Sequence, residues 1–353
     1  MSSIVFTLLW RCVGYGRNQN VIFERNTVMR ITILSALLFL ASLNLAAQAD
    51  INQTVQEYIN SARTKLDLGD YTGAIQDYNK AIELNPDDGF AYEMRGYAKD
   101  NLGDDKGAIQ DYSRAIELDP ETNSSAYYKR GLNEIDLGDY TGAIKSYTKF
   151  IELVPSFEDG YYYRGFAKSK LDDYRGAMQD YNKAIELYPY FDDAYYNRGI
   201  AKSKLDDYRG AMQDYNKAME LDPDYVDAYY SRAIAKHELG DYRGAIQDYT
   251  NYIELNPDTS LTHLIGREYI LLYRDAAAYF NRGNAKYELG DYTGAIQDYT
   301  NFITLNPDDA LAYCTRGAAK YNLGDKNGCC LDFSKAGELG YEDAYDLIKK
   351  YCQ

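Results

Sequence analysis

Small and apolar residues recur along most of this chain with a spacing that predicts pairs of amphipathic helices. In one representative stretch they fall at Ala194, Gly199 and Ala201, which is a helical rather than an alternating pattern. A turn at Asp206–Asp207 follows, and a second apolar run ends just before Pro223, which cannot extend a helix. Such a stretch predicts two helices joined by a tight turn.

The two-helix stretch recurs with a period of 34 residues. A repeat of this length is typical of a stacked array rather than of one globular core. Two interruptions break the period: the extra residue Asn123 and a 16-residue insertion from Ser260 to Asp275. Residues are assigned below to positions 1 to 34 within a copy. Copies one to eight cover 55–88, 89–122, 124–157, 158–191, 192–225, 226–259, 276–309 and 310–343.

Two positions of the repeat carry small residues in nearly every copy. Position 8 is Gly or Ala in all eight copies, and position 20 is Ala in seven and Cys329 in the last. Small residues that face each other let two helix backbones approach, and aromatic residues at positions 4 and 24 then fill the space around them. Most copies also have Gly-Asp at the turn, where glycine suits the left-handed end of the first helix and aspartate can cap the second.

This pattern resembles the tetratricopeptide repeat. The family motif has an aromatic residue at 4, Gly or Ala at 8, Ala at 20, an aromatic residue at 24, Ala at 27 and Pro at 32, and residues 55–343 follow it. Arg at position 7 and Lys at position 11 are departures, each in seven copies. Phe150, Tyr252 and Phe302 replace the small residue at position 27, so packing there is expected to loosen or shift.

The resemblance implies an all-α fold, a right-handed superhelical solenoid of helix-turn-helix repeats whose inner surface binds peptides or proteins. The segment 344–353 repeats the start of a first helix. We expect it to form a C-terminal capping helix, because the last copy has no further repeat to cover it.

The first 49 residues lie outside the repeats. Residues 29–49 combine a short positive start, an apolar stretch and a small-x-small site, which predicts a secretory signal peptide cleaved after Ala49. Translation then starts at Met29, residues 1–28 are a gene-model extension, and the protein is exported to a periplasm or beyond. The alternative is an uncleaved membrane anchor over Ile31–Ala47, although its 17 residues are short for a span of about 20.

The net charge limits the choice of partner. The chain carries −16 at pH 7, and its first 49 residues carry +3, so the chain without them carries −19. An acidic surface repels phosphate backbones, which argues against nucleic acid and favours a protein or peptide with a basic or amphipathic segment. The alternative is that the charge only keeps the protein soluble.

The cysteines favour a disulfide at the C-terminal end. Four of the five lie in the last 40 residues: Cys314, Cys329, Cys330 and Cys352. Thiols in an exported chain favour disulfides, and a Cys330–Cys352 link would tether the capping helix to the end of the array. Free thiols in the core are the alternative. A zinc site is disfavoured because His237 and His263 lie far from these residues in the sequence.

No residue pattern indicates catalysis. The sequence has no glycine-rich phosphate loop, no His paired with a nucleophile motif and no metal-ligand spacing. We therefore predict a non-enzymatic protein with neither cofactor nor metal. The insertion 260–275 could form a short amphipathic helix that acts as a spacer, a lid or a contact element, and a tolerated loop without a role is the alternative.

Basic and acidic residues recur on the two helices of each copy. Position 7 of the first helix is Arg in seven copies, and position 23 of the second helix is Asp in seven. We expect a ladder of partly buried ion pairs that fixes register more than it adds stability. A basic stripe for anionic ligands is the functional alternative.

The first helices carry the candidate binding groove. In tetratricopeptide arrays the face with positions 2, 5, 9 and 12 lines the concave surface, and here that face is aromatic, apolar and acidic. Aromatic rings beside carboxylates suit Lys or Arg side chains, at about 1–2 kcal/mol per partly desolvated contact. The candidate groove residues are Tyr128, Tyr162, Tyr196, Tyr230 and Phe280 at position 5, Leu132, Phe166, Ile200 and Ile234 at position 9, and Asp159, Asp193 and Asp227 at position 2.

We therefore predict that copies three to seven bind an extended, basic or amphipathic segment of a partner protein. The alternative is that the tyrosines only pack between neighbouring first helices. Two other classes of function fit the same pattern: a carbohydrate or cell-wall binder that uses the tyrosines, and a membrane-anchored assembly subunit that keeps its leader.

Overall fold

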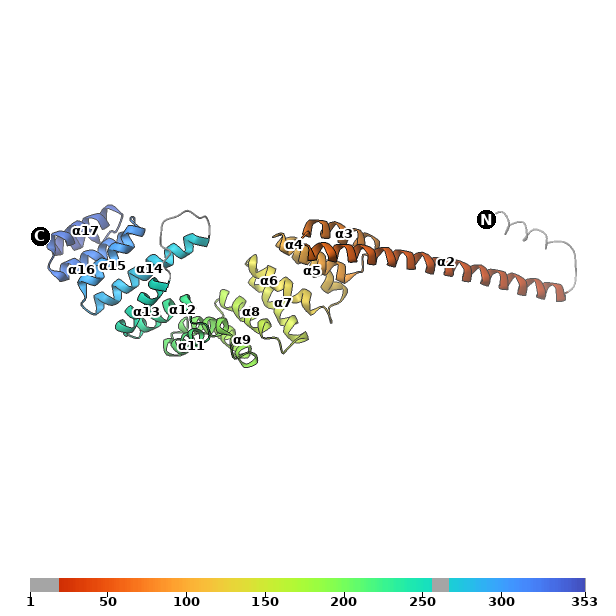
Figure 1. Ribbon diagram of the computed structural model, residues 1–353, viewed down its shortest axis with the longest axis horizontal. Helices are drawn as coiled ribbons and strands as arrows, with labels where there is room; N and C mark the ends of the chain where they lie inside the picture. Colours follow the sequence, from red (N-terminus) through yellow and green to blue (C-terminus); the bar gives the residue numbers. More distant parts are fainter. Residues whose placement is uncertain (1–18, 256–266, 353) are drawn as a thin grey trace. The chain divides into compact units, whose positions relative to one another are not determined.

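The structure is a computed structural model that describes residues 19–255 and 267–352, with side chains described over 29–255 and 276–352. Every regular element in these ranges is an α-helix (Figure 1). The seventeen helices are α2 (Gln19–Asp67), α3 (Tyr71–Leu84), α4 (Gly89–Asn101), α5 (Asp105–Leu118), α6 (Ser124–Asp136), α7 (Tyr140–Leu153), α8 (Glu158–Lys170), α9 (Tyr174–Leu187), α10 (Asp192–Ser203), α11 (Tyr208–Leu221), α12 (Val226–Glu238), α13 (Tyr242–Leu255), α14 (Arg267–Glu288), α15 (Tyr292–Leu305), α16 (Ala310–Leu323), α17 (Lys326–Glu338) and α18 (Ala344–Tyr351).

Each copy contributes two helices, and the predicted turn chemistry is confirmed. The Asp at position 16 caps the second helix in every copy, since its carboxylate accepts a hydrogen bond from the backbone N–H of the Gly at position 19, as in Asp207 and Gly210 at 2.9 Å. Glycine at position 15 adopts a positive φ, 76° at Gly240. Asp172 and Asp206 hold the same left-handed conformation with φ of 61° and 62° in the two copies that lack this glycine.

The small residue at position 8 lies directly against the aromatic ring at position 24 of the same copy. A Cβ added at Gly199 would lie 2.6 Å from the Tyr215 ring, and one at Gly131 would lie 2.8 Å from the Tyr147 ring. No ordinary contact is that short, so glycine is what allows the two helices to pack this closely with a buried tyrosine between them.

The chain divides into two compact units, Met1–Pro120 and Glu121–Gln353. Unit 1 contains copies one and two, in which α3 packs between α2 and α4, and α5 packs on α4. Unit 2 contains copies three to eight. The extra residue Asn123 lies at the start of unit 2, where its side-chain oxygen caps α6 by accepting a hydrogen bond from the N–H of Ala126 at 3.1 Å.

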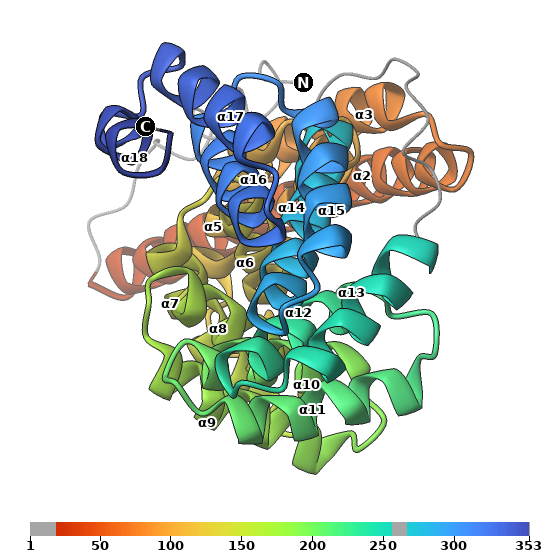
Figure 2. The same cartoon turned by 90° about the vertical axis from the view of Figure 1, so that its left-hand side faces the viewer.

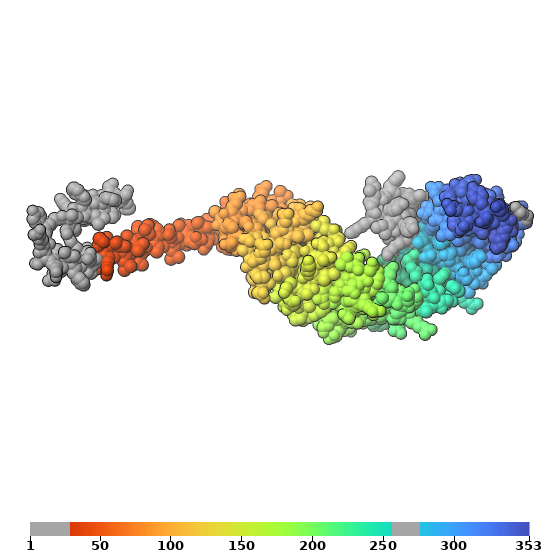
Figure 3. Space-filling view, turned by 180° about the vertical axis from the view of Figure 1, so that it is seen from behind, coloured from red at the N-terminus to blue at the C-terminus, as the bar shows by residue number. Residues whose placement is uncertain are grey.

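Within unit 2, each second helix packs between the first helix of its own copy and the first helix of the next. Successive first helices also contact one another from α6 through α8, α10 and α12 to α14, whereas successive second helices are not in comparable contact in the described part of the unit. First helices are therefore closer together, which puts them on the inner side of the stack. Figure 3 shows the copies packed into one continuous surface from yellow to blue.

The large residues at position 27 are buried, and packing shifts to accommodate them. Phe150, Tyr252 and Phe302 contact the position-5 ring of their own copy at centroid distances of 5.1, 5.2 and 5.0 Å. Room for Phe150 comes from Gly160 at position 3 of the next copy, where an added Cβ would lie 2.7 Å from the ring. In copy three the substitution at position 27 is thus matched by one across the junction, whereas Ala278 and Ala312 keep position 3 after Tyr252 and Phe302.

The predicted leader and the described part of the insertion each extend the first helix of the copy that follows them. Helix α2 runs without a break from the leader region into copy one, and its segment Met29–Asp67 is long and apolar enough to cross a membrane by length and composition. Residues 267–275 of the insertion belong to α14, so they extend the first helix of copy seven rather than forming a separate helix. Residues 260–266 lie outside the described residues. Helix α14 packs on α13, so the stack continues past the insertion.

Replacement of Gly160 by alanine tests the matched pair. We expect Gly160→Ala to lower the free energy of unfolding by about 1–3 kcal/mol, because the added methyl group overlaps the buried Phe150 ring. The same change in a Phe150→Ala background should be nearly neutral. As a control, Ala194→Gly at position 3 of the next copy should cost about 1 kcal/mol through helix propensity alone. Urea denaturation measures all four variants, and an equal cost of Gly160→Ala in both backgrounds would contradict the pairing.

Candidate functional site

The predicted ladder of ion pairs is confirmed. In six copies the Arg at position 7 makes a bidentate pair with the Asp at position 23 of the same copy, as Arg198 does with Asp214 at 2.9 and 2.6 Å. The Lys at position 11 contacts the second oxygen of that Asp, as Lys202 does at 2.7 Å. The aspartates are buried, and a buried charge is costly unless it is paired; here an Arg and a Lys balance each carboxylate.

In the same six copies the arginine also joins its copy to the one before it. Its third nitrogen, Nη1, donates a hydrogen bond to the side-chain oxygen at position 25 of the preceding copy, as Arg198 does to Asn182 at 2.8 Å. Its guanidinium group lies over the ring at position 4, 5.2 Å from the centroid in Arg198 and Tyr195. We call this arrangement the Arg staple. Because its nitrogens are engaged within the array, it is not a free basic stripe for anionic ligands.

Copy three keeps the arginine and exchanges its partners. Position 23 is Ser146 and position 11 is Glu134, so the carboxylate has moved from the second helix to the first. Ser146 accepts a hydrogen bond from Arg130 at 3.0 Å and donates one to Glu134 at 2.7 Å. Burial raises the pKa of Glu134, and the contacts with Ser146 and Arg130 only partly oppose that shift.

The aromatic residues at position 5 are partly or fully buried between the helices. Tyr196 is only 7% exposed, and Tyr128, Tyr162, Tyr230 and Phe280 are half-buried. Each ring also packs against the buried ring at position 24 of its own copy, at centroid distances of 5.6 to 6.0 Å. Burial raises the pKa of Tyr162 and Tyr128. These rings form a layer that supports the first helices.

The hydroxyl groups of these tyrosines contact the following copy. Tyr162 accepts a hydrogen bond from Asn197 at 3.2 Å, Tyr230 accepts one from Asn281 at 3.1 Å, and Tyr196 lies 3.2 Å from the hydroxyl of Ser231. The three partners all occupy position 6. The tyrosines therefore pack between neighbouring first helices, as one of the two interpretations of the sequence expects, and direct groove contact by them stays a prediction.

The carboxylates at position 2 lie beside the same aromatic layer. Asp193 accepts a hydrogen bond from the hydroxyl of Tyr225 at 2.6 Å, and Asp159 accepts one from Tyr128 at 3.4 Å. Asp227 occupies the corresponding half-buried position in copy six. Burial raises the pKa of Asp159. The structure thus brings the predicted carboxylates and tyrosines together at the start of three successive first helices.

The residues at position 9 keep part of their surface exposed. Leu132, Ile200 and Ile234 are half-buried against the cores of their copies, and Phe166 is half-buried beneath the ammonium group of Lys170, 4.9 Å from its ring centroid. They lie on first helices that contact one another along the inner side of unit 2. They are the apolar side chains of the predicted groove that a partner could touch without displacing the core.

The sequence interpretation missed an aromatic residue at position 34. Phe157, Phe191 and Tyr225 stand at the N-cap of α8, α10 and α12, where they make no side-chain cap hydrogen bond. Asp88, Asn123 and Asp309 do cap the first helices that they precede. The three aromatic residues pack on the preceding position-5 ring instead, at 6.1, 4.8 and 4.8 Å. Their replacement of Asp was visible in the aligned copies.

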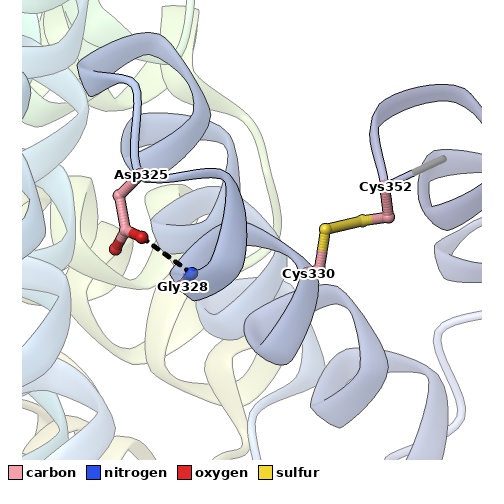
Figure 4. Close-up of a disulfide and its surroundings, with 4 residues drawn as sticks. All are labelled: Asp325, Gly328, Cys330 and Cys352. Atoms are coloured by element: carbon pink, nitrogen blue, oxygen red, sulfur yellow. Dashed lines mark hydrogen bonds between the residues drawn. A yellow bond between two sulfur atoms is a disulfide. The ribbon is translucent and has the colours of Figure 1, made fainter.

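The C-terminal end is closed by α18. A disulfide joins Cys330 of α17 to Cys352, which follows α18, with a Cα–Cα distance of 5.7 Å (Figure 4). Leu347, Ile348 and Tyr351 pack against the core of copy eight, and Figure 2 shows α18 beside α16 and α17. Two further thiols, Cys314 and Cys329, are free and buried in that core. The structure therefore contains both the proposed tether and the core thiols.

An exchange of charges in copy three tests the Arg staple. Ser146→Asp alone places a second carboxylate beside Glu134, and Glu134→Lys alone leaves two cations without a carboxylate, so each should be destabilising. The double variant restores the arrangement of the other copies and should be more stable than the sum of the single variants predicts, by about 1–3 kcal/mol. Denaturation of the four proteins gives this coupling energy. Additive effects would show that the staple does not operate as a unit.

Removal of the disulfide tests the cap. The bond closes a loop with a sequence separation of 22, so Cys352→Ser should cost the C-terminal end about 3 kcal/mol. Hydrogen exchange should accelerate in α18 and copy eight and remain unchanged in copies three to five, because each copy contacts only its neighbours. Reductant should reproduce the effect in the wild-type protein and have none in the variant. Unchanged exchange in α18 would contradict a stabilising tether.

Metal and catalytic sites are not indicated by the geometry. No group of three or more His, Cys, Asp or Glu side chains that could hold a metal ion occurs among the described residues. The buried carboxylates are held by Arg and Lys in the staples, which leaves them unsuited to act as an isolated acid or base.

One solved structure with a TM-score above 0.5 has the same fold, and two others align over about half of this chain. The C-terminal part of a TPR repeat-containing protein from Cytophaga hutchinsonii aligns with a TM-score of 0.59 at 19% identity, over 73% of this chain and 98% of that one. MamA aligns at 0.46 and 27% identity over 50% of this chain and 98% of its own. YrrB, described as a TPR protein with an unusual peptide-binding site, aligns with a TM-score of 0.46 at 23% identity, over 52% of this chain and 93% of its own. No curated protein sequence matches the chain.

Family models match the repeats directly. A model described as TPR repeat matches residues 62–103, 203–240 and 283–324. Three models described as tetratricopeptide repeat also match: one matches 91–122, 159–191 and 226–259, the second matches 180–213, and the third matches 125–156. These matches lie within the repeats of both units. The chain belongs to the tetratricopeptide repeat family and is an all-helical protein–protein interaction scaffold.

Proposed function

We propose that copies three to seven bind an extended segment of a partner protein along the inner face of their first helices. The observation that carries this proposal is the recurrence of half-buried apolar side chains at position 9, on first helices that contact one another in series. Phe166, Ile200 and Ile234 present one such group per copy. An extended chain that crosses the helices can contact these groups in turn.

The neighbouring charges favour a basic or amphipathic segment. Asp159, Asp193 and Asp227 lie on the same first helices as the position-9 residues, and the chain as a whole carries −16. The Arg side chains that could repel a basic partner are engaged in the staples. A partner with Lys or Arg on one side and apolar residues on the other would therefore satisfy both kinds of group.

The tyrosines at position 5 support this face from behind. Their rings are buried or half-buried between helices, and the hydroxyl groups of Tyr162, Tyr196 and Tyr230 contact the next first helix, which keeps the binding residues in fixed positions. A rigid face of this kind loses little conformational entropy on binding. We assign the binding contacts to positions 2 and 9, with the tyrosine layer beneath them.

We further propose that the protein acts outside the cytoplasm, after cleavage at Ala49. The alternative of a membrane-anchored assembly subunit gains support from α2, which joins the apolar leader to copy one in a single helix whose leader side chains are exposed. The mass of the N-terminal peptide in protein purified from its own cells distinguishes the two. A chain that starts at Asp50 supports cleavage, and one that starts earlier supports the anchor.

Substitutions at position 9 test the proposed face. Peptides selected from a displayed random library against residues 50–353 serve as probes, with affinity measured by fluorescence anisotropy. We expect the combined change Phe166→Ser, Ile200→Ser and Ile234→Ser to weaken binding at least tenfold, because it removes three apolar contacts that are only half-buried in the free protein. Gln179→Ala, Gln213→Ala and Gln247→Ala, at exposed positions of the second helices in the same copies, provide the matched control.

One outcome would contradict the proposed binding face. Equal affinity of the position-9 variant and the control for the selected peptides, with unchanged helix content, would show that the partner binds elsewhere on the array.

A further inference from the structure

Three successive junctions between copies carry an aromatic residue where a helix cap is expected. We call the set formed by Phe157, Phe191 and Tyr225 at position 34 and Asp159, Asp193 and Asp227 at position 2 the aromatic–acidic strip. Each aromatic residue of the strip lies two residues before the aspartate of the same junction. The strip covers only the starts of α8, α10 and α12.

Loss of the cap has a cost that packing does not require. A side-chain N-cap contributes about 1 kcal/mol, and the aromatic residues supply none. In copy seven the position-5 ring is covered by Phe302 at position 27, and Asp309 at position 34 remains available as a cap. The array can therefore cover its position-5 rings and keep its caps. In copies four and five position 34 itself supplies the covering ring, so it is in copy three that the aromatic residue goes beyond what packing requires.

Copy three shows this most directly. Phe150 already covers Tyr128 at 5.1 Å, and Phe157 adds a second, more distant contact at 6.1 Å. Phe157 is nevertheless 41% exposed. At the next junction, Tyr188 and Tyr190 lie beside Phe191 with exposures of 44% and 70%. Phe157 of the strip, and Tyr188 and Tyr190 next to Phe191, therefore present aromatic surface to solvent near the position-2 carboxylates.

The charges beside the strip are acidic. Glu158 and Asp192 precede the position-2 aspartates in α8 and α10, and both lie in the first turn. Asp159 and Asp193 each accept one hydrogen bond from a tyrosine, which leaves their negative charge uncompensated by a cation in those contacts. Exposed aromatic surface beside these two carboxylates matches the ammonium or guanidinium groups of Lys and Arg.

Resting on the proposed binding of an extended segment, we propose that the strip binds Lys or Arg side chains spaced three residues apart in that segment. Helices in contact lie about 8–10 Å apart. An extended or polyproline-type chain advances about 9–10 Å over three residues, and in the polyproline conformation every third side chain also points the same way. Each junction then receives one basic side chain, whereas a spacing of two or four would lose alignment by the third junction.

Synthetic peptides of fixed composition test the spacing. Four repeats of Pro-Pro-Lys carry lysine at every third residue, and a peptide of eight prolines followed by four lysines has the same composition and charge. We expect the first to bind at least tenfold more tightly than the second at physiological salt, measured by fluorescence anisotropy with residues 50–353. Four repeats of Pro-Pro-Glu should not bind.

A variant of the protein tests the rings separately from the charge. Phe157→Asp, Phe191→Asp and Tyr225→Asp restore three caps and add three negative charges, and Ala184→Phe with Ala218→Tyr moves the lost rings to position 27, as in copies three, six and seven. The variant should therefore remain folded, which circular dichroism and thermal unfolding verify. We expect it to bind the Pro-Pro-Lys peptide at least tenfold more weakly despite its added negative charge.

The outcomes separate the strip from the proposed binding face. Equal binding of the two lysine peptides, or stronger binding by the more acidic variant, would overturn the strip as a site for spaced basic residues. If the library-selected peptides still depend on Phe166, Ile200 and Ile234 in that case, the proposed function stands without it. Loss of that dependence would overturn the proposed function itself.

Discussion

The Arg staple is the interaction on which the rest of the array depends. In six copies one arginine joins three elements: its own second helix through the buried Asp at position 23, the preceding copy through position 25, and the ring at position 4. Burial of these charges adds little net stability, but a displaced copy would leave a buried aspartate without its cations, which is strongly unfavourable. The staple therefore selects one register between copies. Ser61 replaces the arginine in copy one, where it donates to Asp77 at 2.6 Å.

With register fixed in this way, the aromatic layer can vary. The position-5 rings of copies three to seven are each covered by a second ring 4.8 to 5.2 Å away, which comes from position 27 in copies three, six and seven and from position 34 in copies four and five. The two sources fill the same space from different elements. The choice between them decides what the start of the next first helix presents to solvent: a capping aspartate or an aromatic side chain.

Much of this architecture was predictable from the sequence because it repeats. The helix pairs, the caps of the second helices and the pairing of Arg with Asp each follow from residue type at a fixed position, and the tether from Cys330 to Cys352 was one of two alternatives that the cysteines allowed. How deeply each side chain is buried was not predictable. Periodicity places Tyr196 on the inner side of its helix, but its burial depends on Tyr225 and Tyr215, which belong to another loop and another helix. Similarly, the exchange of partners between Ser146 and Glu134 becomes visible only when both helices of copy three are in place.

The separation between structural and exposed positions explains how this array can act as a scaffold. Positions 7, 11, 23 and 25 hold the copies together, and positions 8, 20 and 24 set the distance between paired helices. None of these needs to change for positions 2, 9 and 34 to acquire new side chains, because the latter lie at the surface of first helices whose geometry is already determined. The usual helix capping is lost at some of these surface positions: Phe157 makes no cap hydrogen bond at the start of α8, whereas Asp309 caps α16. In a fold this regular, a departure repeated at three successive junctions and absent from the rest of the described stack marks those junctions as the candidate binding surface.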